Sequence, residues 1–343
     1  MKRTRKGASY IIGFVPLLIG AVWIAAAQAD PSDFIPGEKT LFYDDFSDMV
    51  KGSPPPHWKV RGAKVDLVIE GESKGLRAEK STNLYANLKG LPEDFTLETD
   101  LKIDLAPITY TATVTWLLGT ESAAYLRLHL AVDNHQASVS VNTSESLGSD
   151  KIKLDLNKPV RLNLWLQKGR LRAYVNEERL IDANQVHLKK LEIARLALNP
   201  QPPVKGTPAI TLARVRIAES TPDFSQVIQS TGRYASHGIH FEVDSDRLQP
   251  ESAPVLKMIV DGLVATPTLK VRIEGHTDNT GDAQHNTELS KRRAESVKNA
   301  LISDFKIDTA RLTTEGLGST KPLDSNDTPT GRANNRRVEF VKQ

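Results

Sequence analysis

Apolar and polar residues alternate with a period of two through most of residues 38–219. The alternation is clearest in four runs, at residues 95–103, 126–132, 160–166 and 171–175. Short alternating runs separated by Gly, Pro and Asn are typical of antiparallel strands with one buried face. A last run, residues 210–217, changes phase between Leu212 and Val215, which indicates a β-bulge. We therefore predict that residues 38–219 form an antiparallel β-sandwich.

Helical spacing replaces this alternation in the last third of the chain. One set of apolar residues predicts a helix that starts near Pro250 and stops at Pro267, and another predicts a helix that opens at Leu289. Short apolar runs predict four strands, at residues 239–243, 269–274, 311–316 and 338–341. This order predicts an α/β domain whose mixed sheet carries helices on one face. We place it at residues 235–343, after a linker at residues 220–234.

The N-terminus has the layout of a secretory signal peptide. Four of the first six residues are basic, and an apolar run extends from Ile11 to Ala26. Ala27 and Ala29 then provide the small residues that a signal peptidase requires. We predict a signal peptide at residues 1–29 and export of the mature chain. The competing interpretation is an uncleaved inner-membrane anchor, since the apolar run is barely long enough to span a bilayer.

The net charge argues against one class of function, and the lack of cysteine excludes several kinds of site. The 343-residue chain has a formal net charge of +3, but residues 1–29 hold four basic residues and no acidic one, so their removal leaves −1. A near-neutral mature chain argues against nucleic-acid binding, which needs clustered positive charge. The chain has no cysteine, which excludes disulfides, thiolate metal sites and a lipid-modified cysteine.

An acidic residue at the end of a predicted strand is followed by bases on a predicted helix. Asp278 comes shortly after the strand at residues 269–274, and residues 291–293 are all basic. A carboxylate binds an ammonium group, and the planar fork of an arginine binds two carboxylate oxygens at once. Such a pair can hold a ligand that carries both a cation and an anion. The alternative is an internal salt bridge between Asp278 and Arg293, with the arginines near the C-terminus as a solvated cluster.

Several separated motifs carry a resemblance to a known family. They are Phe241-Glu242-Val243-Asp244-Ser245, Gly275-His276-Thr277-Asp278, Asn286, Leu289-Ser290, Arg293-Ala294 and Gly331-Arg332-Ala333-Asn334-Asn335-Arg336-Arg337-Val338-Glu339. In their order and spacing, residues 235–343 resemble the OmpA-like C-terminal domain, a family that includes the Pal lipoproteins and the periplasmic part of the MotB stator. The resemblance implies non-covalent binding of peptidoglycan through the diaminopimelate of its stem peptide. It also implies a location in the periplasm or at the cell outer membrane, associated with the cell wall.

The resemblance further implies which residues form the peptidoglycan-binding site. They are Thr277, Asp278, Asn286, Arg293 and Arg336. Asp278 is expected to receive the ammonium group of diaminopimelate, and Arg293 to pair with its carboxylate. Thr277 and Asn286 stand where the family adds hydrogen bonds, and Arg336 where it has a further arginine. We expect no cofactor and no metal at this site.

The sandwich region carries a second resemblance. Its opening, Asp44-Asp45-Phe46-Ser47, and residues 169–176 resemble parts of laminin-G and concanavalin-like sandwiches, which implies a concanavalin- or jelly-roll-like fold. Some folds of this kind are glycoside hydrolases with alternating carboxylates on one strand. Here Lys102 interrupts the series after Glu98 and Asp100, and a lysine there would keep the carboxylates ionised. We therefore expect a solvated outer sheet face and no enzyme.

The leading hypothesis is a wall-bound envelope protein that presents the sandwich as a separate module. The alternative is a wall-tethered carbohydrate-binding or adhesive protein, and a glycan-active enzyme is a third candidate. Three tryptophans, Trp58, Trp116 and Trp165, could stack on sugar rings, although core positions are commoner for this residue. The sequence leaves open whether the sandwich binds a glycan or an envelope protein, and whether the chain forms a homodimer.

Overall fold

The computed structural model describes residues 33–70, 73–104, 111–133, 136–188, 191–200, 208–220 and 222–343. The predicted signal peptide, at residues 1–29, lies outside the described residues. Within the described part of the chain, no helix is both long enough and apolar enough to cross a membrane.

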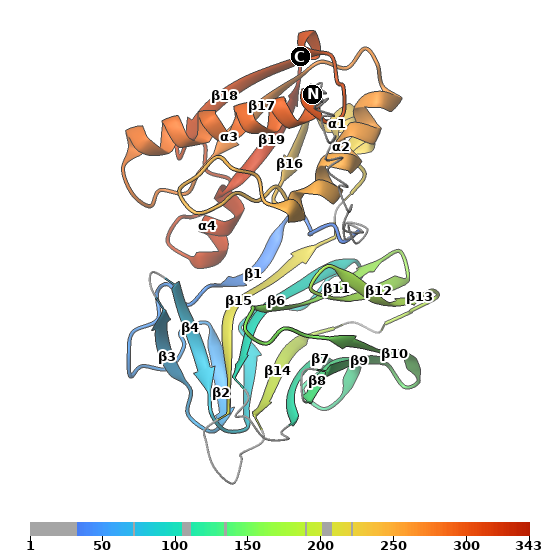
Figure 1. Ribbon diagram of the computed structural model, residues 1–343, viewed down its shortest axis with the longest axis vertical. Coiled ribbons are helices and arrows are strands. Elements are labelled where there is room, and N and C mark those ends of the chain that lie inside the picture. Colours follow the sequence, from blue (N-terminus) through green and yellow to red (C-terminus); the bar gives the residue numbers. More distant parts are fainter. Residues whose placement is uncertain are drawn as a thin grey trace, which may run out of the picture. The chain divides into compact units, whose positions relative to one another are not determined.

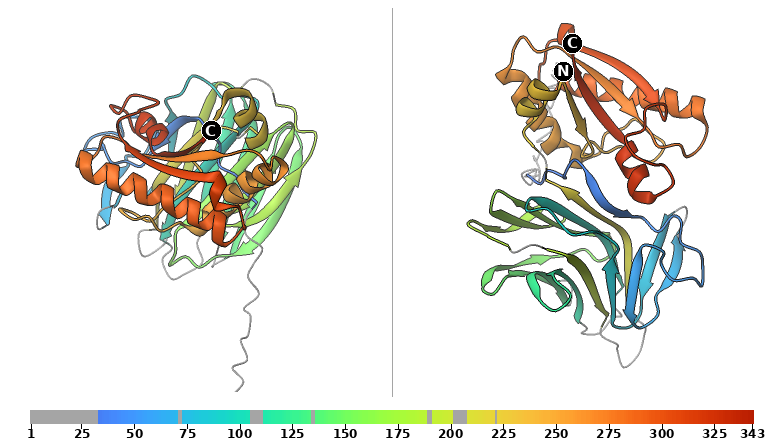
Figure 2. Two further views of the ribbon diagram at one scale, coloured as in Figure 1. Left: turned by 90° about the horizontal axis from the view of Figure 1, so that it is seen from above. Right: turned by 180° about the vertical axis from the view of Figure 1, so that it is seen from behind.

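Two antiparallel sheets form the predicted β-sandwich (Figure 1; Figure 2). The first sheet has the order β13-β12-β11-β6-β15-β4-β3, with β1 paired to β15. Its strands are β1 (Thr40–Asp44), β3 (Asp66–Glu70), β4 (Ser73–Ala78), β6 (Phe95–Asp104), β11 (Val160–Gln167), β12 (Arg170–Val175), β13 (Glu178–Ala183) and β15 (Ala209–Glu219). The second sheet has the order β10-β9-β8-β7-β14-β5-β2. Its strands are β2 (Trp58–Gly62), β5 (Thr82–Ala86), β7 (Thr111–Gly119), β8 (Ala124–Asp133), β9 (Gln136–Asn142), β10 (Ser146–Lys153) and β14 (Ile193–Pro200).

One apolar core fills the space between the two sheets. Phe95, Leu97 and Leu101 of β6 are fully buried in it, together with the inward residues of the other strands. The four alternating runs of the sequence lie in β6, β8, β11 and β12, as predicted. The predicted bulge is confirmed, because the register of β15 against β6 shifts between Leu212 and Arg214.

The remaining residues form the predicted α/β domain around a four-stranded mixed sheet. Its strands are β16 (Arg233–Ser236), β17 (Val271–His276), β18 (Leu312–Gly318) and β19 (Arg337–Lys342), and its helices are α1 (Phe224–Thr231), α2 (Ala253–Ala265), α3 (Ala283–Ser303) and α4 (Pro329–Asn335). The sheet order is β16-β19-β17-β18, with β17 and β18 parallel and the other pairs antiparallel. Helices α1, α2 and α3 pack on one face of the sheet, where Ile273 and Phe340 are fully buried (Figure 1).

The first strand of this domain does not lie where the sequence pattern predicted it. The strand is β16, whereas residues 239–243 form a loop in which Phe241 makes an isolated bridge to Leu248. β16 is only four residues long, too short to show alternation. Its place is set instead by long-range contacts, since Tyr234 pairs with Phe340 across the sheet and stacks edge-on against Phe224.

Helix α1 lies in the segment that we expected to be a linker, residues 220–234. Asp223 caps it by accepting the backbone N–H of Gln226, and Gly232 follows its last turn with a φ of 74°. Phe224 and Ile228 are buried in the core of the α/β domain. The helix has only eight residues, so its apolar pattern is too brief to stand out from a polar linker. The domain limits themselves stay predictions.

The outer face of the first sheet is not solvated at Glu98, contrary to the expectation from the sequence. Glu98 is 3% exposed, and Arg216 on the neighbouring β15 donates to its Oε1 atom over 2.8 Å. Arg214 of β15 donates to the Oδ2 atom of Asp100 over 2.8 Å. Burial raises the pKa of Glu98, but the charges of Arg216 and Arg214 outweigh burial and hold the pKa below its usual value. Both carboxylates are therefore ion-pair partners.

Residues of the α/β domain explain why this face is buried. Glu251 pairs with Arg161 of β11, and Asn334 exchanges two hydrogen bonds with the backbone of Thr40 in β1. Alternation in a sequence identifies the outward face of a strand, but it does not show what covers that face.

Removing the arginine of the buried pair should destabilise the protein strongly. We expect Arg216→Ala to lower the free energy of unfolding by about 3–5 kcal/mol, because Glu98 then stays buried without its main partner. Urea denaturation of the full chain measures the change. The matched control is Arg170→Ala, which removes the arginine of an exposed ion pair with Asp182 and should cost far less. Equal losses in the two variants would contradict this account.

Candidate functional site

The loop after β17 presents the acidic residue of the candidate site. Asp278 lies two residues beyond β17, and its Oδ1 atom accepts the backbone N–H of Thr280 over 2.9 Å. The backbone N–H of Thr277 donates to the carbonyl of Gly318 over 3.0 Å, which ties the loop to the end of β18. The Thr277 hydroxyl donates to the carbonyl of Asp278 over 2.8 Å. These bonds hold a largely buried carboxylate just beyond the C-terminal end of β17.

Asn286 shapes the same loop from helix α3. Asp282 caps this helix by accepting the backbone N–H of His285 over 2.8 Å, so α3 begins directly after the loop. One turn later, the Nδ2 atom of Asn286 donates to the carbonyl of Thr280 over 2.8 Å. The side chain of Asn286 therefore supports the loop that carries Asp278.

The ion-pair partner of Asp278 is Arg336, which directly follows helix α4. The Nη1 atom of Arg336 lies 2.6 Å from the Oδ2 atom of Asp278. The helix begins at a cap in which the hydroxyl of Thr328 accepts the backbone N–H of Gly331 over 3.0 Å. The side chain of Arg336 is 37% exposed, so the pair borders the solvent. The structure thus brings two of the expected site residues together from positions far apart in the chain.

Arg293 is held by a different set of contacts. Its Nε atom donates to the carbonyl of Ser245 over 2.8 Å, and its guanidinium lies over the ring of Phe241, 5.0 Å from the ring centre. Burial lowers the pKa of Arg293, but an arginine stays charged at neutral pH. Among the described residues Asp278 pairs with Arg336 and not with Arg293. The alternative of an internal salt bridge between Asp278 and Arg293 is therefore wrong.

The other basic residues near the site do not join it. Lys291 and Arg292 are exposed on α3, as expected of a solvated helix side. Arg337 is 5% exposed, and its Nε atom donates to the Oε1 atom of Glu339 over 2.7 Å. The alternative of a solvated arginine cluster at the C-terminal end is therefore wrong for Arg337, because β19 turns this side chain onto the sheet.

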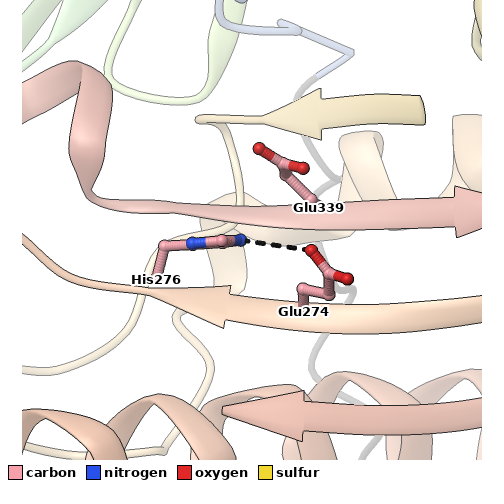
Figure 3. Close-up of side chains that lie close together, drawn as sticks. All are labelled: Glu274, His276 and Glu339. Carbon is pink, nitrogen blue, oxygen red and sulfur yellow. Dashed lines mark ion pairs between the residues drawn. The ribbon is translucent and has the colours of Figure 1, made fainter. Parts of the chain in front are cut away.

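A second cluster of ionisable groups, not identified from the sequence, lies on the sheet face away from α1, α2 and α3. Glu274 and His276 are two residues apart in β17 and therefore lie on the same face of the sheet. Glu339 of the neighbouring strand β19 lies directly opposite Glu274 (Figure 3). All three residues are buried, and their possible ligand atoms lie within 4.8 Å of one another. The spacing of two in one strand was visible in the sequence, but the strand pairing that adds Glu339 was not.

Arginines argue against a metal ion in this cluster. Arg337 and Arg233 donate to the two carboxylate oxygens of Glu339 over 2.7 and 2.5 Å. Arg272 donates to the Oε1 atom of Glu274 over 2.9 Å from Nε and 2.5 Å from Nη2. A divalent cation would have to displace these guanidiniums and would be repelled by their charges. We interpret the cluster as an ion-pair network within the sheet.

His276 is the neutral member of this network. Its Nε2 atom lies 3.6 Å from the Oε2 atom of Glu274, and neither ring nitrogen has a hydrogen-bond partner among the described residues. Burial, and then the charge of Arg337, lower the pKa of His276 to about 4, against the opposing effect of Glu339 and Glu274. The ring is therefore uncharged at neutral pH.

Comparison with known proteins identifies the family of this chain. Residues 240–336, which contain every residue of the candidate site, match the OmpA family. Over 130 residues the chain is 37% identical to the putative lipoprotein YfiB of Escherichia coli strain K12, and this match covers 35% of the chain and 81% of that protein. The chain belongs to the OmpA family. Its α/β domain is called the OmpA-family domain from here on.

Other relatives share the OmpA-family domain. The outer membrane protein Omp38 of Acinetobacter baumannii is 34% identical over 133 residues, which cover 39% of this chain and 37% of Omp38. The peptidoglycan-binding protein ArfA of Mycobacterium bovis is 43% identical over 103 residues, which cover 30% of this chain and 31% of ArfA. The chain thus spans roughly a third of the length of each of these two relatives.

Acid should destabilise the OmpA-family domain through His276. The pKa of this residue is about 4 in the folded chain and near 6.5 in the unfolded chain. Between these pH values the unfolded chain binds a proton that the folded chain does not, so the free energy of unfolding falls as the pH drops. We expect His276 alone to contribute a loss of about 3 kcal/mol over this range.

Urea denaturation at a series of pH values, with two variants, separates this effect from other titrating groups. His276→Gln should show a smaller decline in the free energy of unfolding than the wild type. The matched control is His187→Gln, which changes an exposed histidine of the sandwich, leaves the network around His276 intact and should keep the wild-type decline. An unchanged decline in His276→Gln would show that His276 does not titrate as described.

Proposed function

We propose that this protein is a non-enzymatic, exported cell-envelope protein that binds peptidoglycan non-covalently. The group it binds is the free amino-acid end of diaminopimelate in the stem peptide, and the OmpA-family domain binds it. The observation that carries this proposal is that Asp278 and Arg293 are fixed by separate contacts in one domain and do not neutralise each other. Similarity to ArfA, a protein named as peptidoglycan-binding, supports it.

Asp278 is suited to receive the ammonium group of the ligand. Its Oδ1 atom accepts the N–H of Thr280, and its Oδ2 atom accepts an N–H of Arg336. An ionised carboxylate has about four lone-pair positions, so acceptor capacity remains for an ammonium group. Because the two bonds already fix the carboxylate, a ligand would not have to order it on binding. Arg336 is in this view a residue that orients Asp278.

Arg293 is suited to receive the ligand carboxylate. The carbonyls of Ser245 and Glu242 accept from its Nε and Nη2 atoms, over 2.8 and 3.5 Å. A guanidinium has five N–H donors in a fixed plane, so donors remain for a carboxylate. The ring of Phe241 supports one face of that plane. A rigid, partly desolvated guanidinium is a better partner for a carboxylate than a mobile lysine would be.

The number of charged hydrogen bonds sets a range for the affinity of the site for one stem peptide. Hydrogen bonds that involve a charged group contribute about 1.5–3 kcal/mol each. Two or three of them, after the cost of ordering the ligand, correspond to affinities from roughly millimolar to tens of micromolar for one stem peptide. The cell wall presents many stem peptides, so several domains held together would attach firmly.

The sandwich offers no support for the lectin or glycosidase alternatives at the residues that suggested them. Trp58, Trp116 and Trp165 are 5%, 0% and 6% exposed, so they are not available to stack on a sugar ring. Glu98 and Asp100 are bound by arginines, and the arginines hold the pKa of Glu98 below its usual value, so Glu98 is unsuited to donate a proton. We therefore assign the residues that contact the wall to the OmpA-family domain.

Sedimentation with purified peptidoglycan tests the proposal. Asp278→Ala and Arg293→Ala should each weaken binding by roughly tenfold or more, because each removes one charge-assisted contact. Arg292→Ala, which removes the exposed neighbouring arginine of the same helix, is the matched control and should bind as the wild type. Peptidoglycan with lysine in place of diaminopimelate should bind more weakly than the diaminopimelate type. If all the variants sediment equally, the assigned site is wrong.

A further inference from the structure

The first strand of the sandwich lies beside the helix that carries Arg336. Strand β1 and helix α4 are separated by nearly the whole length of the chain, yet they lie side by side (Figure 1). The backbone N–H of Tyr43 in β1 donates to the hydroxyl of Thr330 in α4 over 3.0 Å. Three residues earlier in β1, Thr40 donates its N–H to Asn334 over 2.9 Å and accepts from the same amide over 3.2 Å. These bonds fix β1 along α4.

The side chain of Tyr43 reaches the binding site through this contact. The guanidinium carbon of Arg336 lies 5.3 Å from the centre of the Tyr43 ring, within the range of a cation–π contact. The same guanidinium donates to the Oδ2 atom of Asp278 over 2.6 Å. Arg336 is therefore held from two sides, by an aromatic ring of the sandwich and by the acidic residue of the proposed site.

Burial raises the pKa of Tyr43 above its usual value, with smaller effects from Arg336 and other charges. The phenol is therefore neutral at physiological pH, and it offers Arg336 the face of a π-system rather than a negative charge. A neutral ring restrains the guanidinium without competing with Asp278 for its charge. A phenolate or a carboxylate in this place would draw the arginine away from Asp278.

We propose that Tyr43 is a positioning residue of the diaminopimelate site, so that the sandwich contributes to peptidoglycan binding by holding Arg336 against Asp278. This inference rests on the function proposed above, and it gives the sandwich a part in that function. A long arginine side chain has many rotamers, so an unrestrained Arg336 leaves Asp278 part of the time. The ring of Tyr43 reduces that freedom before the ligand arrives, which favours binding.

The test measures the dissociation constant of the full chain for a soluble stem peptide that ends in meso-diaminopimelate. Tyr43→Ala should weaken binding by roughly three- to tenfold, the range expected for one cation–π contact that is partly desolvated. Tyr43→Phe keeps the ring and should bind within about twofold of the wild type. Circular dichroism and urea denaturation confirm that each variant is folded.

The matched control is Tyr85→Ala in β5. Tyr85 also contacts arginines of the sandwich, since Arg61 and Arg195 lie 5.0 and 5.9 Å from its ring centre. It has no part in the contact between β1 and α4, so its removal should leave the dissociation constant unchanged. A loss of affinity in Tyr85→Ala equal to that in Tyr43→Ala would show a general effect on the sandwich and would overturn the proposal.

A double-mutant cycle shows whether Tyr43 acts through Arg336. In the Arg336→Ala background, Tyr43→Ala should cause no further loss of affinity, because the group that it positions is already gone. Equal losses from Tyr43→Ala in the two backgrounds would overturn the positioning role. If the wild type binds the peptide and Tyr43→Ala binds equally well, only this inference fails. If the wild type does not bind the peptide at all, the proposed function fails, and this inference fails with it.

Discussion

The fixed orientation of one carboxylate, that of Asp278, depends on contacts from several elements of the OmpA-family domain. Asp278 lies in the loop that follows strand β17. The parallel neighbour β18 anchors this loop, because the carbonyl of Gly318 accepts the backbone N–H of Thr277. Helix α3 holds the loop through Asn286, and the residue after α4, Arg336, binds the carboxylate itself. Two strands, helix α3 and Arg336 thus each restrain this acidic group, while Arg293 is held by separate contacts and is, in the proposed function, the partner of the ligand carboxylate.

Ion pairs and hydrogen bonds join the sandwich to this domain, together with the side chain of Ile35, which packs against buried residues of both. Glu98 and Arg216 are almost completely buried, and Arg161 pairs with Glu251 of the other domain. A buried ion pair contributes little net stability but is costly to break, so it restricts the partners that the sheet face accepts. Arg216 also donates to the hydroxyl of Thr40 in β1, which pairs with β15, and β1 brings Tyr43 to Arg336.

Much of the architecture could be predicted because it is encoded locally. Alternation identified β6, β8, β11 and β12, and the phase change in the last run of the sandwich identified the bulge of β15. Elements of four to eight residues, β16 and α1, were missed because their pattern is too short and their place is set by distant partners. The expected site residues followed from the motifs of the family, but their contacts did not. Arg336 rather than Arg293 pairs with Asp278, since the fold and not the spacing decides which arginine arrives there.

The most direct test of diaminopimelate binding follows Asp278 and Arg293 while the ligand is added. In the full chain, the side-chain Nε–H signals of Arg293 and Arg336 can be followed by NMR as meso-diaminopimelate is added. The account predicts that both signals shift along one saturable curve, together with the backbone amide of Asp278, while the signal of Arg292 stays in place. If diaminopimelate binds without moving the signals of Arg293 and Asp278, the assignment of this site is contradicted.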